Sequence, residues 1–166
     1  RAKKLSRQKT CDMVMPFASG ASAMRGGYTS GMGELKALDK QLLVERHLIS
    51  REHAAKGSGS ALVLNKNETL SVMVNEEDHL RIQVIQSGFQ PAEAFQAAYS
   101  FERDLAGGLD FAVSKRWGFL TACATNTGTG LRASTLIHLP GLALTKEMDG
   151  VVRGVAQLGF AVRGIY

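Results

Sequence analysis

The chain has 166 residues, of which 45% are hydrophobic, and its formal net charge is +5. This length allows one domain with a hydrophobic core, and no apolar run approaches the roughly 20 residues that a membrane-spanning helix requires. Two cysteines exclude a disulfide-rich secreted scaffold, and reduced thiols fit a cytoplasmic protein. We do not expect a membrane as a partner.

The amino-terminal segment is basic and then rich in glycine. Five Lys or Arg side chains and no acid occupy residues 1–9, and residues 17–33 contain few large apolar side chains. A basic terminus can bind nucleic acid, but no aromatic and basic recognition motif accompanies this one, so nucleic acid is not the expected partner. We predict that residues 1–33 are poorly organised and that the domain proper covers residues 34–166.

The middle of the chain predicts a helix followed by antiparallel strands. Leucines at helical spacing favour a helix over residues 34–44, and Gly57 to Ser60 is typical of a flexible turn. Apolar and alternating residues then predict three strands, the first two joined as a hairpin. These strands cover residues 61–64, 70–74 and 80–84.

The second half alternates between helices and strands. Pro91 suits the first turn of a helix that Gly107 and Gly108 would end, and Thr145 is a candidate cap for a later helix. Further strands are predicted over residues 110–113, 117–123, 131–139 and 160–165. The mixture predicts an α+β domain, with a largely antiparallel sheet flanked by helices.

The segment from Asn75 to Arg81 reads NEEDHLR and places three carboxylates beside an arginine. Strand alternation would put Asn75 and Glu77 on one face and the other two acids on the opposite face. A carboxylate that points into a cleft can bind a guanidinium through two hydrogen bonds and accept its proton. The alternative is a solvated acidic turn, because exposed acids are common.

Three arginines lie between apolar neighbours on predicted strands: Arg81, Arg132 and Arg163. Each would project from the sheet face opposite its apolar neighbours, and guanidinium groups bind phosphate oxygens bidentately. Three of them over one face could neutralise a triphosphate. The alternative is a set of surface arginines paired with acids.

Cys123 precedes a glycine-containing turn, Asn126 to Gly130. The turn lacks the Gly-Lys-Ser/Thr ending of a Walker loop, but its backbone could still present N–H groups to an anion. The Thr125 hydroxyl would lie near the thiol and favour the thiolate, whereas the alternative is an inert buried cysteine. His47 could contact an adenine or serve the structure, and no spacing of His, Cys or acids indicates a zinc site.

Taken together, NEEDHLR, the stretch from Cys123 to Ser134 and the sequence His138-Leu139-Pro140 resemble the phosphagen kinase superfamily, the ATP:guanido phosphotransferases. Residues 43–50 and 162–166 resemble the branch of bacterial protein arginine kinases. The resemblance implies a glutamine-synthetase-like catalytic domain, of which residues 34–166 would be a part. It also implies phosphorylation of arginine side chains in proteins, marking them for Clp-type proteolysis.

The same resemblance implies roles for individual residues. Glu77 would orient the guanidinium and act as base, with Cys123 beside it. ATP and its phosphates would contact Arg81, Arg132, Arg163 and His47. Mg²⁺ would arrive with ATP rather than occupy a protein metal site. Two other functions remain open: a kinase of free arginine, and a catalytically impaired fragment that binds nucleotide or protein. The residues expected to support the site are Asn75, Thr125, Asn126 and Gly128.

Overall fold

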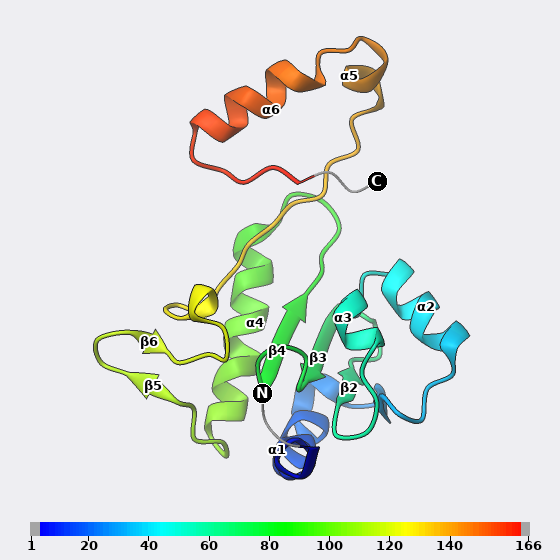
Figure 1. Ribbon diagram of the computed structural model, residues 1–166, viewed down its shortest axis with the longest axis vertical. Coiled ribbons are helices and arrows are strands. Elements are labelled where there is room, and N and C mark those ends of the chain that lie inside the picture. The colour runs from blue at the N-terminus through cyan, green and yellow to red at the C-terminus, as the bar shows by residue number, and fades with distance from the viewer. Residues whose placement is uncertain (1–3, 164–166) are drawn as a thin grey trace. The chain divides into compact units, whose positions relative to one another are not determined.

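The computed structural model of the chain describes residues 4–163, with the backbone alone for Lys4 and Leu5 (Figure 1). The chain divides into two compact units, residues 1–133 and 134–166. The larger unit combines helices with an antiparallel sheet, as expected for an α+β fold. No helix within the described residues is long and apolar enough to cross a membrane.

One four-stranded antiparallel sheet organises the larger unit. Its strands lie in the order β1 (Tyr28–Gly31), β2 (Ala61–Leu64), β3 (Leu70–Val74) and β4 (Leu80–Val84). Asn65 closes the β2–β3 turn, because its side-chain oxygen accepts hydrogen bonds from the backbone N–H groups of Thr69 and Leu70 at 2.8 and 3.0 Å. The three predicted strands and their hairpin are therefore confirmed.

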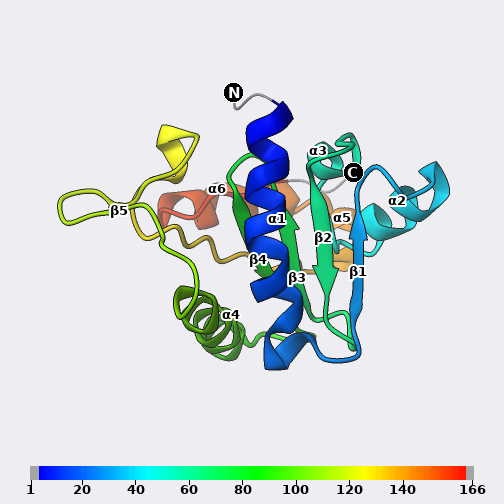
Figure 2. The same cartoon turned by 90° about the horizontal axis from the view of Figure 1, so that it is seen from below.

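The sheet is covered on both faces. On one face, Val63 and Val72 face each other across β2 and β3 and pack with α1 (Lys4–Gly20) and α4 (Pro91–Ala106). Figure 2 shows α1 crossing this face. The opposite face packs with the segment between β1 and β2, which contains α2 (Ala37–Glu45) and α3 (Arg51–Ala54). The buried residues of this second cluster are Met32, Leu48, Ile49, Leu62, Leu64 and Met73.

The prediction of a poorly organised segment over residues 1–33 is wrong for the described part, residues 4–33. This part contains α1, a short 3-10 helix η1 (Ser22–Met24) and β1. Cys11, Val14 and Ala18 lie at helical spacing and are buried against the sheet, which provides the apolar contact that the helix needs. Residue 33 is therefore not a domain boundary, because β1 pairs with β2.

Glycine lets β1 approach β2 at the strand entry. A Cβ atom on Gly27 would lie 1.9 Å from the backbone oxygen of Leu64. We expect Gly27→Ala to lower the free energy of unfolding by about 1–3 kcal/mol, because the backbone must move apart to accept the methyl group. Urea unfolding measures the change. Gly20→Ala is the matched control, since no atom lies within 4 Å of the added Cβ, and an equal loss in both variants would contradict the explanation.

The predicted helices of the larger unit are present with small shifts at their ends. The helix expected over residues 34–44 is α2, and Pro91 occupies the first turn of α4, as predicted. Phe101 and Leu105 are the buried side chains of α4, whereas Phe95 and Tyr99 stack on each other at its exposed side.

Three predicted strands after α4 are shortened or missing. A hairpin of β5 (Val113–Ser114) and β6 (Gly118–Phe119) replaces the strands expected over 110–113 and 117–123. Residues 131–139 form no strand, although their apolar residues alternate. Alternation stabilises a strand only where a neighbouring strand pairs with it, and no described residue forms a ladder with this segment.

The smaller unit contains α5 (Pro140–Leu144) and α6 (Met148–Gln157). Thr145 does not cap the later helix, because it ends α5 and its hydroxyl bonds the Gly141 carbonyl at 3.0 Å. Residues 160–163 do not form the predicted strand, and residues 164–165 lie outside the described part. Within residues 134–163 no side chain is fully buried.

Candidate active site at the β3–β4 turn

A left-handed asparagine turns the chain between β3 and β4. Asn75 has φ 59°, and its N–H donates to the His79 carbonyl at 2.9 Å. Its side-chain nitrogen donates to the carbonyls of Arg7 and Gly59 at 2.8 and 2.7 Å. Asn75 therefore fixes the acidic turn to α1 and to the turn before β2.

The predicted alternation of the acidic residues is wrong. Glu76 is 7% exposed and lies beside the buried Asn75, whereas Glu77 and Asp78 both face the Cys123 loop. The reason is the left-handed conformation of Asn75, which ends the extended backbone that alternation requires.

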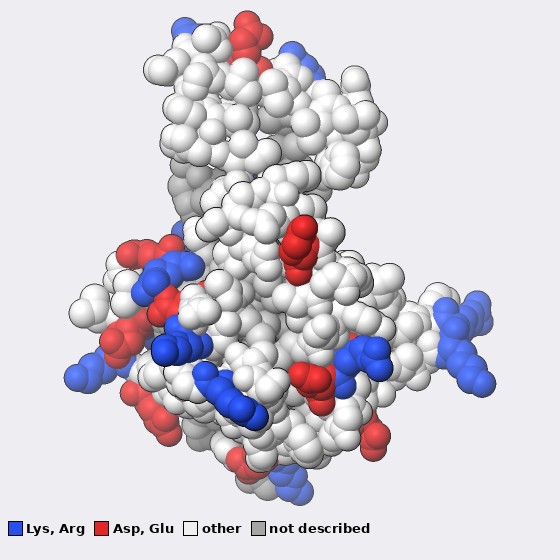
Figure 3. Space-filling view, turned by 180° about the vertical axis from the view of Figure 1, so that it is seen from behind, with Lys and Arg blue, Asp and Glu red and all other residues white. Residues whose placement is uncertain are grey.

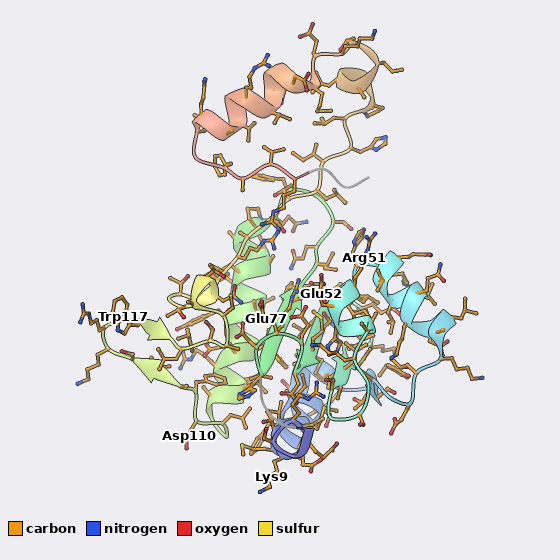
Figure 4. All side chains as sticks on the ribbon, viewed as in Figure 1. Lys9, Arg51, Glu52, Glu77, Asp110 and Trp117 are labelled. Atoms are coloured by element: carbon orange, nitrogen blue, oxygen red, sulfur yellow. The ribbon has the colours of Figure 1, made fainter. Side chains whose placement is uncertain are left out.

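Asn126 joins the acidic turn, on which Figure 4 labels Glu77, to the Cys123 loop. Its amide nitrogen donates to Asp78 at 2.9 Å and to Glu77 at 3.2 Å. Asp78 also accepts a 2.6 Å hydrogen bond from the backbone N–H of Ala122. The structure thus brings together two motifs that lie more than 40 residues apart in the chain. Asp78 holds the loop, whereas Glu77 is exposed and carries a single long bond from this loop.

Hydroxyl groups support the backbone around Cys123. The Cys123 sulfur lies 3.0 Å from the Thr125 hydroxyl, as expected from their spacing. Thr121 donates to the Cys123 carbonyl at 2.6 Å. Gly128, with φ 129°, pairs its backbone with Phe119, which ties the loop to the β5–β6 hairpin. The thiol is half-buried, so a reactant can reach it.

Glu76 is an organising residue that the sequence analysis did not select. It accepts hydrogen bonds from the Ser50 hydroxyl at 2.5 Å, from Arg81 at 3.0 Å and from the Glu77 backbone N–H at 2.5 Å. Burial alone would raise the pKa of Glu76. The Ser50 hydrogen bond, the Arg81 charge and the Glu77 N–H outweigh burial and lower that pKa.

Arg81 lies on the predicted face of β4. Its Cα partner is Met73, which belongs to the cluster on the face opposite α1, while Leu80 packs toward α1. The guanidinium bonds Glu76, and the Arg81 side chain is 43% exposed, so part of the side chain remains open to a ligand.

The other predicted nucleotide contacts belong to other segments of the chain. Arg132 is exposed in an irregular segment, and Arg163 is exposed in the smaller unit. Neither lies on a strand, so the alternation argument is wrong for both. His47 is exposed and has φ 57°. Its backbone carbonyl accepts a hydrogen bond from the Gln83 side chain at 2.5 Å. Contacts of these three residues with ATP remain predictions.

Two of the site residues that were not predicted could have been found from the sequence. Ser50 precedes α3 and accepts a hydrogen bond from the His53 N–H at 2.9 Å, which is the behaviour of an N-cap serine. Asp78 belongs to the acidic triplet already identified. Nothing in the sequence distinguishes Glu76 as the buried member.

A buried histidine beside this network gives the fold a pH dependence. His53 is fully buried, and its Nε2 donates to the Ala61 carbonyl at 3.0 Å, while Nδ1 has no partner. Burial lowers the pKa of His53 from 6.5 to about 4. The folded state therefore disfavours the protonated form, and its stability is complete above pH 6.5 and declines as the pH falls toward 4.

We expect urea midpoints of the wild-type protein to fall between pH 7.5 and pH 5. His53→Gln should reduce this decline, because the amide can still donate to Ala61 but does not titrate. His47→Gln should leave the decline unchanged, since His47 is exposed. A decline of the same size in His53→Gln would show that other groups cause it.

The chain is similar in sequence to known protein-arginine kinases. A protein-arginine kinase from Halothermothrix orenii is 43% identical over all 166 residues, which cover 47% of its own length. One from Bacillus pumilus is 49% identical over 135 residues, 81% of this chain and 37% of the relative. The chain thus spans about half the length of the curated relatives it matches, or less.

Solved structures agree on the fold. The duplicated taurocyamine kinase from Schistosoma mansoni with bound transition state analog components matches 86% of this chain and 22% of its own, at 26% identity and a TM-score of 0.74. Lombricine kinase matches 91% of this chain and 46% of its own, at 21% identity and a TM-score of 0.71, which shows a shared fold. The family model of the ATP:guanido phosphotransferase C-terminal catalytic domain matches residues 11–166. The chain therefore belongs to the ATP:guanido phosphotransferase family, as part of its C-terminal catalytic domain.

Proposed function

We propose that this protein transfers the terminal phosphoryl group of MgATP to the guanidinium group of arginine side chains in proteins. The observation that supports the proposal most directly is the contact between Glu77 and the Cys123 loop through Asn126. It places an exposed carboxylate beside the loop that carries a half-buried thiol, within a chain of the guanido phosphotransferase family.

Glu77 is the group that would bind the acceptor. Its carboxylate has about four lone-pair positions, and Asn126 uses one of them through a 3.2 Å bond, so two N–H groups of a guanidinium can still be accepted. One guanidinium nitrogen then attacks the terminal phosphorus, the bond from that phosphorus to the ADP oxygen breaks, and Glu77 accepts the proton released from the nitrogen. Cys123 would contact the guanidinium from the neighbouring loop.

Arginines would neutralise the nucleotide phosphates. Arg81 is the first candidate, because Glu76 fixes its position while 43% of its side chain remains exposed. Arg132 and Arg163 would join it, and His47 would contact the adenine. Mg²⁺ would enter with ATP, which carries the phosphate ligands that this ion prefers. Within the described residues no group of three or more His, Cys, Asp or Glu side chains could hold an ion by itself.

The proposed acceptor is a protein rather than free arginine, because the relatives with 43–49% identity are protein-arginine kinases. We further propose that the phosphoarginine marks its carrier for Clp-type proteolysis in the cytoplasm. The test uses ATP labelled at its terminal phosphate, with an arginine-rich protein and with free arginine as acceptors. Acid-labile label on the protein supports the proposal. Label on free arginine alone would contradict the protein acceptor, and nucleotide binding without transfer would favour a binding function.

A further inference from the structure

The β5–β6 hairpin presents an aromatic and basic tip. Its turn contains Lys115, Arg116 and Trp117, all exposed, and Trp117 is 57% exposed. The Arg116 guanidinium carbon lies 4.6 Å from the centre of the Trp117 ring, a distance typical of a cation–π contact. This contact holds the guanidinium in place, while its edge N–H groups remain available to a ligand.

The two cations of the tip have no acidic partner. Among the described residues neither Lys115 nor Arg116 forms an ion pair, in contrast to Arg46 and Arg81, which pair with glutamates. Figure 3 shows a projecting basic group at the side of the molecule where the hairpin lies, with no acidic atoms beside it. Figure 4 shows Trp117 at the outer end of the hairpin. The tip is therefore a surface of positive charge next to an exposed indole.

The hairpin is fixed to the loop that carries Cys123. Phe119 exchanges two backbone hydrogen bonds with Gly128, at 2.8 and 3.2 Å, and Leu120 donates to the Ala112 carbonyl at 2.8 Å. Phe111 packs edge-on against Phe119 with ring centres 6.0 Å apart. Trp117 and Cys123 are six positions apart in the chain, which limits the distance between their Cα atoms to about 20 Å. An extended polypeptide of about six residues could reach from the tip to the reactive loop.

We propose that the tip Lys115–Trp117 is a docking element for an acidic segment of the protein substrate. This inference rests on the proposed function and defines its substrate class. Carboxylates of the substrate pair with Arg116 and Lys115, and an apolar side chain of the same segment packs on the Trp117 ring. Arg and Trp are the residue types that most often dominate the binding energy of protein interfaces. The preferred substrates carry acidic residues about four to eight positions from the phosphorylated arginine.

A nucleic acid is the other acidic partner that a basic tip could bind. Two cations would release few counterions on binding a nucleic acid, so the affinity would depend only weakly on salt concentration. Contacts to phosphate groups would also not depend on how far acidic residues lie from an arginine in a peptide. A peptide is favoured because the tip offers one guanidinium matched to a carboxylate and one exposed indole, and because it is attached to the Cys123 loop.

The chain contains a single tryptophan, so its fluorescence reports directly on the tip. The probe is a peptide with one arginine and three glutamates centred six residues away, and the control peptide has glutamine in place of each glutamate. We expect the acidic peptide to shift the Trp117 emission and to bind at least tenfold more tightly than the control peptide. Equal affinities for the two peptides would overturn the proposal, as would tighter binding of an oligonucleotide that displaces the acidic peptide.

Charge reversal supplies the matched variant. The double variant Lys115→Glu/Arg116→Glu should bind the acidic peptide at least tenfold more weakly than the wild-type protein, whereas Lys66→Glu, in the exposed β2–β3 turn, should change affinity less than twofold. Circular dichroism confirms that both variants fold. Unchanged affinity in the double variant would overturn the docking role.

Phosphoryl transfer separates this inference from the proposed function. If the docking role holds, the double variant raises KM for the acidic peptide and leaves kcat nearly unchanged, since the reactive groups are elsewhere. Transfer with equal kcat/KM for the acidic and control peptides would overturn the docking role and leave the proposed function intact. Tight binding of the acidic peptide without any transfer would support docking and contradict the proposed function.

Discussion

Glu77→Gln is expected to lower kcat by about 10²–10⁴, the usual contribution of a positioned general base. Glutamine keeps the size of the side chain, and its oxygen can still accept the 3.2 Å bond from Asn126. It cannot take up the proton that the attacking nitrogen loses, and its neutral amide binds a guanidinium less strongly than a carboxylate does. The affinity for ATP should change little. Steady-state kinetics with a protein acceptor measures the effect.

Asp110→Asn is the matched control for Glu77→Gln. Asp110 is an exposed acid before the β5–β6 hairpin, and removal of its charge should leave kcat within about twofold of the wild-type value, as for a surface change away from the site. Thermal unfolding should give similar transitions for both variants. Wild-type kcat in Glu77→Gln would show that this carboxylate is not the base.

Glu76→Ala is expected to have the largest combined effect on stability and activity. The substitution removes the acceptor of three hydrogen bonds, which come from Ser50, Arg81 and the Glu77 backbone. A loss of about 2–3 kcal/mol in the free energy of unfolding is expected, below the 3–5 kcal/mol of a fully buried pair, because Arg81 is 43% exposed. Urea denaturation measures it.

The activity of Glu76→Ala should fall about 10- to 100-fold, because Glu77 loses the contact that positions its backbone. Glu76→Gln separates charge from shape, since it retains an acceptor for Ser50 and Arg81 but not the negative charge. The wild-type protein keeps the pKa of Glu76 below 4.5, so this carboxylate stabilises the fold above that pH and ceases to do so as the pH falls through its lowered pKa. Glu76→Gln should flatten this acidic part of the stability curve. An unchanged curve would contradict the assigned interactions.

The strands that were predicted correctly have an apolar run or a period-two pattern, together with turns that specify their pairing. Asn65 closes the β2–β3 turn with its own side chain, and Asn75 starts the next turn from a left-handed conformation that asparagine tolerates. The segment 131–139 has an equally regular pattern and forms no strand among the described residues. A period-two pattern indicates which face of a strand could be buried. It does not indicate which other strand would form hydrogen bonds with it, and without such a partner no strand forms.

Helix α1 was missed because its buried face is narrow. Cys11, Val14 and Ala18 are small side chains, and the glycine-rich residues that follow dilute the apolar signal. Their contact with the sheet depends on α4 and on strands far along the chain, which local composition does not describe.

The candidate site could be predicted only in part. Resemblance identified Glu77 and Cys123, and the structure places their two segments in contact through Asn126. Which of the three acids is buried and which face the Cys123 loop was not predictable, because this follows from the backbone conformation of Asn75 rather than from residue type. Arg132 and Arg163 were assigned by alternation on strands that are absent from the described residues, so their convergence on the site remains a prediction.

The order of the sheet has a consequence for how the protein folds. Strands β2, β3 and β4 are joined by short turns, whereas β1 reaches β2 only after a segment of 29 residues that contains α2 and α3. Closing a long loop costs more chain entropy than closing a short one, and contacts between distant residues slow folding. The three-stranded meander is therefore expected to nucleate first, with β1 joining its edge late. Since the acidic turn lies within that meander, the backbone of the site would be formed early in the folding reaction.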